Sequence, residues 1–334
     1  MLRQHLVSRS RLLSQVVSII IVNYNAGHLL TRCLEALRKQ THRPRQICVV
    51  DNASRDGSCD RIAVDFPEVT LVRNEQNTGF AAANNLAVRR AQGCEWIALL
   101  NPDAFPEPTW LERLVAAAET NPEVACFASR MIQQHRPEYL DGAGDAYHVS
   151  GLVWRRGYDL PGEGDYLETK EVFSSCAASA LYRRDAFEAA GGLDEDFFCY
   201  LEDVDLAFRL RLAGYRCLYV PDAVVRHVGS ATTGKDSDFA VYHGHRNMVW
   251  TYVKNMPGLL FWLYLPLHIA ANIYIVFRYA LKGRWRVILK SKRDAIRGLP
   301  KMWKKRREIQ ARRVVGAREI RKVMEKGLSR RSGS

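Results

Sequence analysis

Several patterns that mark common sites are missing from this chain. The eight cysteines form no Cys-x-x-Cys pair and no other metal-ligand spacing, which favours buried thiols in a reducing compartment. No Gly-x-Gly-x-x-Gly follows the first apolar run, so a dinucleotide-binding Rossmann domain is disfavoured. Residues 1–15 are basic and hold no apolar run long enough for a signal peptide. We therefore expect a location in the cytoplasm or on its membrane face.

Charge is unevenly distributed along the 334 residues, of which 47% are hydrophobic. Such a chain can bury a full core with a second small unit. Residues 282–334 carry 20 Lys and Arg against 4 Asp and Glu, a net charge of +16. The rest holds 29 basic and 32 acidic residues, a net charge of −3. The basic tail is expected to attract a polyanion, either nucleic acid or an anionic membrane surface.

Apolar β-branched runs alternate with helical periodicity through the first half of the chain. The expected strands are 16–23, 46–51, 69–73, 96–100 and 124–129, and the expected helices are 28–39, 56–66, 79–91 and 109–120. Short βα units in series predict an α/β fold, with a mainly parallel sheet and helices on both faces. Ligands of such sheets bind at the carboxyl ends of the strands.

Polar residues gather where these strands are expected to end. Tyr24 can stack on a nucleobase, and Asp51 or Asn52 can contact a pyrimidine edge or a ribose. Asp103, in an Asn-Pro-Asp turn, can hold magnesium or manganese through a carboxylate oxygen. Each cluster taken alone is also an ordinary turn or helix cap. Their placement at successive strand ends favours one ligand site.

The stretch 191–209 holds six carboxylates. Acids favour the first turn of a helix, so Glu202 and Asp203 are expected to start the helix that runs to Gly214. Asp203 shares a helix face with apolar residues, which predicts partial desolvation, a raised pKa and a role as general base. Asp205 lies four residues before Arg209 and is interpreted as a surface ion-pair residue. The alternative is an acidic helix start on a solvated loop.

The residues from about 16 to 257 resemble family 2 glycosyltransferases of the GT-A fold, more narrowly the bacterial rhamnosyltransferase-like branch. The stretches that carry this resemblance are VSIIIVNYN, VVDNASRDGS, NTGFAAANN, ALLNPDA and GGLDEDFFCYLEDVDLAFRLRLAGY. The resemblance implies a mostly parallel central sheet flanked by helices. It also implies inverting transfer of a sugar, with rhamnose the lead, from a nucleotide-diphosphate sugar. The acceptor would be a saccharide or a polyprenyl-linked saccharide in cell-surface polysaccharide synthesis.

The resemblance also assigns roles. Asp203, in the family's Glu-Asp motif with Glu202, would be the base. Asp103 would bind a divalent cation, Mg or Mn, and His227 would complete the metal site. Asp194 and Glu195 would contact acceptor hydroxyls. The donor site would include Asn23, Tyr24, Asn25, Asp51, Asn52, Asn77, Gly79, Asn85, Asn101 and Asp103.

The chain departs from the family pattern in two places. Asn101-Pro102-Asp103 has one carboxylate where many relatives have two, and Asp51-Asn52 stands where relatives often have two aspartates. The residue that reads the base therefore stays open.

Two further stretches are interpreted from their residues. Trp154, beside two arginines in an irregular segment, suggests a lid or acceptor loop. Arg246, on the helix expected at 238–254, is placed to meet a phosphate or simply to pack beside the site.

The apolar stretch 258–277 holds 20 residues without Asp, Glu, Lys or Arg, within the spanning range of about 17–25. One crossing would separate the catalytic body from the basic tail, although both are expected in the cytoplasm. Pro266 divides the stretch, and His268 and Asn272 are costly in lipid. We therefore expect a peripheral or re-entrant segment on the cytoplasmic face of the inner (plasma) membrane, with the tail as a basic amphipathic helix on anionic headgroups. A buried helix hairpin in a soluble protein is the alternative.

The expected organisation has four parts: a basic arm at 1–15, the GT-A domain at 16–256, the apolar segment at 257–281 and the basic tail at 282–334. Two other functions are disfavoured. A nucleotidyltransferase would need a glycine-rich loop bearing Lys or Arg after the first strand, and Asn23-Tyr24-Asn25-Ala26-Gly27 is not one. A nucleic-acid-binding protein would use the basic tail, but the acidic body and the apolar neighbour favour a membrane, so no nucleic-acid partner is expected.

Overall fold

A computed structural model describes residues 16–229 and 237–327, so the predicted arm at 1–15 lies outside the described residues. The strands are β1 Val17–Asn23, β2 Gln46–Asp51, β3 Val69–Arg73, β4 Trp96–Leu100, β5 Ala104–Pro106, β6 Val124–Gln133, β7 Leu140–Gly142, β8 Asp145–Tyr147, β9 Val153–Arg155, β10 Lys170–Glu171, β11 Ser179–Arg183 and β12 Arg216–His227. The helices are α2 His28–Arg38, α3 Ile62–Asp65, α4 Gly79–Arg90, α5 Trp110–Thr120, α6 Arg184–Ala189, α7 Glu202–Leu212, α8 Asp238–Asn255, α9 Gly258–Leu281, α10 Trp285–Arg297, α11 Leu299–Ala311 and α12 Ala317–Val323.

The central sheet has the order β10-β12-β6-β11-β4-β1-β2-β3. In addition, β5 pairs with β12 and β7 pairs with β6. β4, β1, β2 and β3 run parallel to one another, and so do β6 and β12. β11 is antiparallel to both of its neighbours. The predicted mainly parallel sheet is confirmed. The helix expected at 56–66 is only the four residues of α3, and the fifth strand runs on to Gln133.

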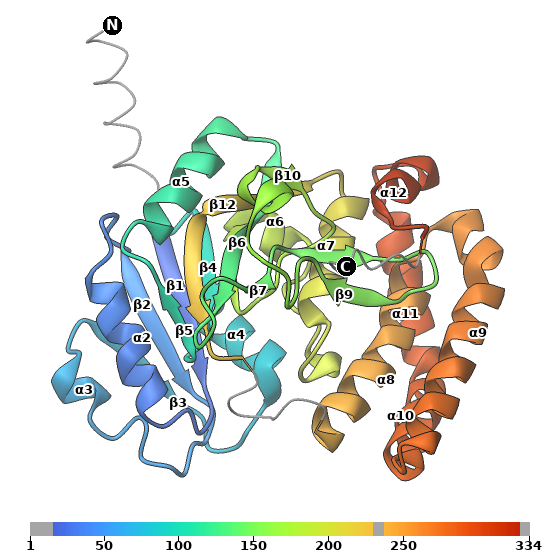
Figure 1. The fold of residues 1–334 in the computed structure, drawn as a ribbon, viewed down its shortest axis with the longest axis horizontal. Helices are drawn as coiled ribbons and strands as arrows, with labels where there is room; N and C mark the ends of the chain where they lie inside the picture. The colour runs from blue at the N-terminus through green and yellow to red at the C-terminus, as the bar shows by residue number, and fades with distance from the viewer. Residues whose placement is uncertain (1–15, 230–236, 328–334) are drawn as a thin grey trace, which may run out of the picture.

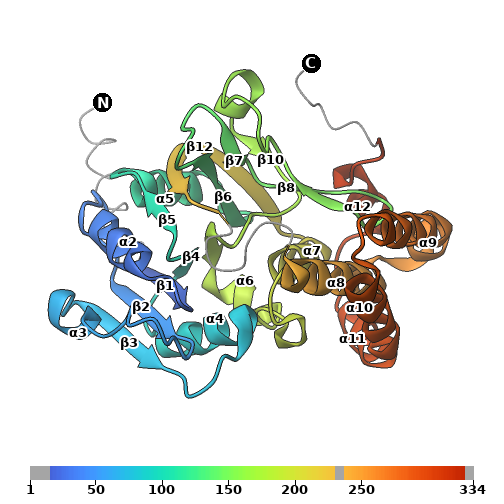
Figure 2. The same ribbon diagram turned by 60° about the horizontal axis from the view of Figure 1, so that its bottom comes forward.

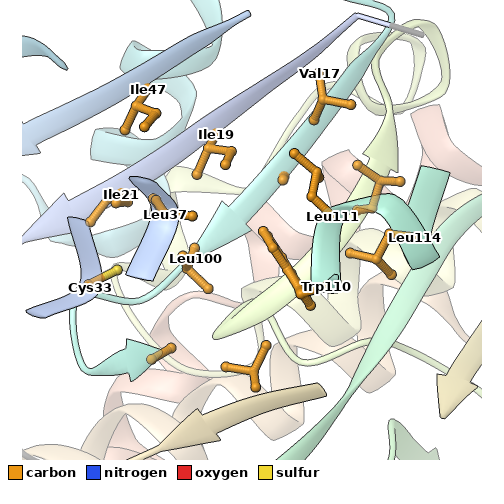
Figure 3. Packing of buried hydrophobic residues seen from close by; sticks show 14 of the residues in the cluster. Val17, Ile19, Ile21, Cys33, Leu37, Ile47, Leu100, Trp110, Leu111 and Leu114 are labelled. Carbon is orange, nitrogen blue, oxygen red and sulfur yellow. The ribbon is translucent and has the colours of Figure 1, made fainter. Parts of the chain in front are cut away.

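Helices cover both faces of the sheet (Figure 1). Each residue of β1 is buried, and its side chains alternate between two cores. Ile19 and Ile21 face the core under α2 and α5, which Figure 3 shows around Trp110. Ile20 faces the second core, under α4, α6 and α7. This burial on both faces explains why the strand sequences read as continuous apolar runs.

The C-terminal third forms a helical bundle, α8 to α12, at one side of the sheet (Figure 2). Its first helix, α8, packs against α7. α10 and α11 pack on α8, and α9 packs against α10 and α12. Two expectations need correction. Pro266 does not divide the apolar stretch, because α9 runs through it as one helix of 24 residues. The described part of the tail, residues 282–327, forms three helices, α10 to α12, rather than one amphipathic helix.

Asp205 is fully buried, so its interpretation as a surface ion-pair residue was wrong. The pairing with Arg209 is present, with Nη2 2.8 Å from Oδ2. Asp205 also accepts hydrogen bonds from Lys254 Nζ at 2.8 Å and from Asn255 Nδ2 at 2.7 Å. Lys254 is itself 1% exposed and donates to Asp194 as well. This buried charge network joins α7 to α8.

We predict that Asp205→Ala destabilises the protein by about 3–5 kcal/mol, because it leaves the buried Lys254 ammonium short of a counter-charge. Urea unfolding followed by circular dichroism measures the change. Glu319→Ala is the control, since it removes an ion pair with Lys322 whose side chains are 58% and 71% exposed. That control should cost no more than about 1 kcal/mol. Equal effects of the two substitutions would contradict the account of the buried network.

Candidate active site

The carboxyl ends of β1, β2 and β4 lie side by side and carry the polar residues of the predicted donor site. Asn23 is in register with Asp51 across β1 and β2. Asp51 is buried, accepts from Arg73 Nη1 at 3.1 Å and accepts from the Ser54 amide at 3.0 Å. Tyr24 directly follows β1 and is 38% exposed, so its ring is open to stacking.

Three of the predicted donor residues use their side chains inside the protein. Asn23 is buried and donates to Ser54 Oγ at 3.0 Å and Ser58 Oγ at 2.8 Å. Asn52 is also buried, donates to Asn77 Oδ1 at 2.9 Å and accepts from the Thr78 amide at 3.1 Å. Asn77 Oδ1 in turn accepts from the Gly79 amide at 2.9 Å. These amides fix the loops that follow β2 and β3.

Asn25 and Asn101 occupy the same edge. Asn25 has a left-handed backbone with φ of 52°, and its Oδ1 accepts from the Arg55 amide at 2.8 Å. Asn101 Oδ1 is buried and has no hydrogen-bond partner among the described residues. An unpaired buried acceptor is costly, so this oxygen is free to bind a ligand or water.

Gly79 and Asn85, on α4, contact the acidic stretch instead of solvent. Gly79 has φ of +85°, and a Cβ there would lie 2.6 Å from the ring of Phe198, so only glycine fits. Asn85 donates to the Leu193 carbonyl at 2.8 Å and accepts from the Leu193 amide at 3.0 Å. It also donates to Glu195 Oε1 at 3.0 Å. Gly79 and Asn85 therefore anchor the segment that precedes α7.

Asp103, His227 and Asp141 form a buried chain of side chains. His227 Nδ1 lies 2.8 Å from Asp141 Oδ2, and its Nε2 lies 3.3 Å from Asp103 Oδ1. Burial lowers the pKa of His227, but hydrogen bonds and charges from the two aspartates outweigh it and raise the pKa to about 9. The pKa of Asp103 is lowered, because His227 outweighs the effect of burial on that carboxyl.

The Asp103–His227 pair fits a divalent cation. Nε2 of His227 is buried, and its contact with Asp103 Oδ1 at 3.3 Å is one that a cation between the two atoms would replace. Two ligand atoms on one octahedral cation with bonds of about 2.1 Å lie about 3 Å apart, close to the 3.3 Å seen here. No group of three or more His, Cys, Asp or Glu gathers as a metal site among the described residues. Mg²⁺ needs only one or two carboxylates when substrate phosphates and water complete its shell, and Asp103 supplies one.

Asp203 lies in the first turn of α7, as predicted. Its Oδ2 accepts from the Ala177 amide at 2.9 Å, and its Oδ1 accepts from the Val204 amide at 2.8 Å. Burial raises the pKa of Asp203 despite these hydrogen bonds and the nearby charge of Arg155. Burial and the charge of Asp203 also raise the pKa of Glu202 well above its ordinary value. A half-buried carboxylate with a raised pKa is suited to accept a proton.

Sequence reasoning missed three residues of this site, Asp141, Asp145 and Arg155. Arg155 donates to Asp141 Oδ2 at 2.5 Å, and its charge acts on the pKa of Asp203. Asp145 is buried, and burial together with the charge of Asp203 raises its pKa to about 7. All three belong to the short strands β7, β8 and β9 in a segment without clear periodicity. Arg155 therefore links the chain of Asp103, His227 and Asp141 to Asp203.

Two of the three predicted acceptor residues line a pocket apart from Asp203. Asp194 and Glu195 line a pocket of about 760 Å³ between the segment before α7 and helix α11, and Asp203 is not among its described lining residues. Asp194 pairs with Lys254 and Lys305, which lower its pKa despite burial. Trp154 lies beside His148, with ring centroids 6.1 Å apart.

The charged His227 predicts a pH dependence of stability in chelating buffer. Its folded-state pKa of about 9 exceeds the ordinary value of 6.5, so the stabilisation is complete below pH 6.5 and is lost as pH rises through 9. One pKa unit corresponds to about 1.4 kcal/mol, so complete loss of this stabilisation lowers the free energy of unfolding by about 3 kcal/mol. Urea unfolding of the wild type and of His227→Gln measures it. The difference in unfolding free energy between the wild type and His227→Gln should shrink from pH 6.5 to 9. A difference that stays constant over this range would show that His227 is neutral.

Two solved structures have a similar fold. GalNAc-T7, solved with UDP, GalNAc and Mn²⁺, matches 72% of this chain and 48% of its own chain, with TM-score 0.58 and 19% identity. The mannosyltransferase PcManGT of Pyrobaculum calidifontis, solved with GDP-Man and Mn²⁺, matches 92% of this chain and 91% of its own, with TM-score 0.51 and 19% identity. These likenesses confirm the GT-A fold.

Sequence relatives point to the same family. An N-acetylglucosaminyl-diphospho-decaprenol L-rhamnosyltransferase of Mycobacterium tuberculosis is 29% identical over 256 residues, covering 69% of this chain and 82% of the relative. An O-antigen chain rhamnosyltransferase of Salmonella typhimurium is 26% identical over 234 residues, covering 68% and 72%. The family described as "Glycosyl transferase family 2" matches residues 18–191, more than half of the chain. The chain therefore belongs to glycosyl transferase family 2.

Proposed function

We propose that the protein is an inverting glycosyltransferase with Asp203 as its general base. The observation that carries the proposal is the Asp203 carboxylate at the start of α7, held by two backbone amides while burial raises its pKa. In a single displacement, Asp203 takes the proton of an acceptor hydroxyl as that oxygen attacks the anomeric carbon. The bond to the nucleotide diphosphate breaks on the opposite face, which inverts the configuration. Family membership favours this reaction over nucleotidyl transfer.

The donor would lie along the strand ends. The exposed ring of Tyr24 would stack on the base, and Asp51 would contact the base or the ribose. Asp103 and His227 would hold a magnesium or manganese ion, which supplies charge neutralisation for the leaving diphosphate. The Mn²⁺ in the two solved GT-A neighbours supports this assignment. Asn101 Oδ1, buried and unpartnered in the described part of the chain, would contact the donor nearby.

The substrates are proposed from the relatives. Two of them are named rhamnosyltransferases, and one name specifies a decaprenyl-diphosphate-linked acceptor. We infer a nucleotide-diphosphate sugar donor, with rhamnose carried on deoxythymidine or uridine diphosphate as the lead. The acceptor would be a saccharide or polyprenyl-linked saccharide hydroxyl in cell-wall or O-antigen synthesis.

Asp203→Asn should lower kcat by about a hundredfold to ten-thousandfold, because the amide cannot accept the proton. Donor affinity should stay nearly unchanged. Nucleotide diphosphate release measures kcat, and titration calorimetry with the donor measures affinity. Asp222→Asn is the control, since Asp222 is an exposed acid on β12. A mutant that keeps more than about a tenth of the wild-type rate would mean that another residue is the base.

We also propose that α9 lies on an anionic membrane surface. α9 is the one helix among residues 16–229 and 237–327 that is long and apolar enough to cross a membrane. Its outer face is strongly exposed, including Trp262 at 61%, Ile273 at 64% and Phe277 at 62%. Its polar residues point to the protein instead. His268 Nδ1 lies 2.7 Å from the Ser150 carbonyl oxygen, and Asn272 accepts from Lys292 Nζ at 2.6 Å.

This two-faced helix favours an interfacial position over a span. A spanning helix would be surrounded by lipid and would separate His268 from the catalytic body. Exposed cations on α10 and α11 follow directly in the chain and would meet anionic headgroups on the cytoplasmic side. The catalytic body would then sit beside a lipid-linked acceptor.

The double substitution Trp262→Glu with Phe277→Glu should weaken binding to vesicles containing phosphatidylglycerol by at least about tenfold, because it places charge on the lipid-facing stripe. The matched control places Glu at Val64 and Leu167, which are 73% and 54% exposed on the sheet domain. Vesicle co-sedimentation at several salt concentrations measures binding.

A C-terminal tag provides the topology arm of this test. The tag should be accessible from outside only in inverted vesicles. Exposure in right-side-out vesicles would mean a span, and full recovery of the protein in the soluble fraction at low salt would remove the membrane proposal.

A further inference from the structure

The segment 196–201, directly before Glu202 and Asp203, has an unfavourable backbone conformation. Phe198, Tyr200 and Leu201 have φ angles of 65°, 70° and 64°. Six non-glycine residues in the described chain have positive φ, and three of them lie here. Each such residue costs on the order of 1–3 kcal/mol and persists only where its surroundings impose it. Something outside the segment must therefore hold it.

Helix α8 supplies the hold. Asn247 is fully buried, and the two N–H groups of its side-chain amide are shared among three carbonyl oxygens of the segment. The distances are 3.0 Å to Phe197, 2.9 Å to Cys199 and 2.7 Å to Tyr200. A single amide nitrogen thus fixes carbonyls from both sides of Phe198. The segment has few alternatives, because buried carbonyls without a donor are costly.

Arg246 adds further hydrogen bonds to the segment, and we call the contacts of Asn247 and Arg246 with residues 196–201 the clamp. The Arg246 side chain is itself held in place. Its Nη2 donates to the Asp196 carbonyl at 3.1 Å and to the Phe197 carbonyl at 2.8 Å. Its Nε donates to Asn247 Oδ1 at 2.9 Å, and its guanidinium lies 4.2 Å from the Trp250 ring centroid. Of the two alternatives for Arg246, a phosphate contact or packing beside the site, this geometry favours the second.

The clamp determines where the acidic motif lies. Leu201 is the last residue before α7, and its carbonyl accepts from the Asp205 amide at 2.9 Å in the first turn. On the other side of the motif, the Ala177 amide holds Asp203. A shift in the segment would move Glu202 and Asp203 relative to Arg155 and to the predicted donor residues at the strand ends.

We propose that Asn247, supported by Arg246, is a positioning residue that holds segment 196–201 in its left-handed conformation and so sets the place of Asp203. This inference rests on the proposed role of Asp203 as base. A displacement of about 1 Å in a reacting group can cost about a hundredfold in rate. The hydrogen bonds of Asn247 go to the segment and to Arg246 rather than to the strand ends, and the segment meets the proposed donor residues where Phe198 packs on Gly79, so the loss should fall mainly on kcat.

The test compares Asn247→Ala with Thr251→Ala. Thr251 is one turn further along α8, is equally buried, and its hydroxyl has no partner among the described residues. Both variants lose buried side-chain volume, but only the first loses the clamp. We expect Asn247→Ala to lower kcat by about a hundredfold with donor KM changed by less than about threefold. Thr251→Ala should keep kcat within about threefold.

Cys199 provides a readout that needs no substrate. It is half-buried, whereas the other seven cysteines are buried. Release of its carbonyl from Asn247 should speed its alkylation by iodoacetamide at least about tenfold, followed by peptide mass spectrometry. Thr251→Ala should leave that rate unchanged. Because this readout is independent of catalysis, it separates failure of the clamp from failure of Asp203 as base.

Arg246→Lys covers the case in which Asn247→Ala does not fold. Lysine keeps the charge but has a single nitrogen, which cannot occupy the positions of both Nη2 and Nε, so the contact with Asn247 is lost and kcat should fall by about five- to tenfold with faster Cys199 alkylation. Unchanged kcat and unchanged alkylation in the folded variants would overturn the proposal. So would an equal loss of kcat in Thr251→Ala, because the effect would then be general loosening of α8.

Discussion

The contact between the sheet domain and the helical bundle depends on the buried charges of Asp205, Lys254 and Asp194. A buried ammonium without counter-charges is strongly unfavourable, so Lys254 requires both carboxylates in place. Asp205 belongs to α7, Asp194 to the segment before it, and Lys254 to α8. This network therefore fixes α8 against the start of α7. The clamp by Asn247, the position of Asp203 and the placement of α9 all require that α8 lies there.

Much of the fold could be predicted from the sequence, because strands buried on both faces give continuous apolar runs. The site was only partly predictable. The strand-end motifs identified polar residues that lie together at the ends of β1 and β2, but a local motif does not tell whether an amide faces a ligand or fixes a loop, as Asn23, Asn52 and Asn85 do. Asp205 looked like a surface residue because its main partner, Lys254, lies 49 residues away. Arg155 was missed for the same reason, since its contact with Asp141 joins two short strands without a periodic pattern.

The C-terminal helices also show the limits of composition. The apolar stretch predicted a membrane-associating segment, and Pro266 suggested a break in it. Proline is tolerated here, and α9 continues through it. The two polar residues that argued against a span, His268 and Asn272, form hydrogen bonds with the protein body and with α10. The same residues that would be costly in lipid thus orient the apolar face of α9 outward, where we propose it meets the bilayer.

The most direct test of the account is a donor screen with a lipid-linked acceptor extract, followed by determination of the anomeric configuration of the product. The account predicts acceptor-dependent release of nucleotide diphosphate from one nucleotide sugar, loss of that release in chelator, and a product with inverted configuration. Retention of configuration would contradict a single displacement with Asp203 as base. Full activity in chelator would contradict the metal role of Asp103 and His227, and no release from any nucleotide sugar would contradict the proposed reaction.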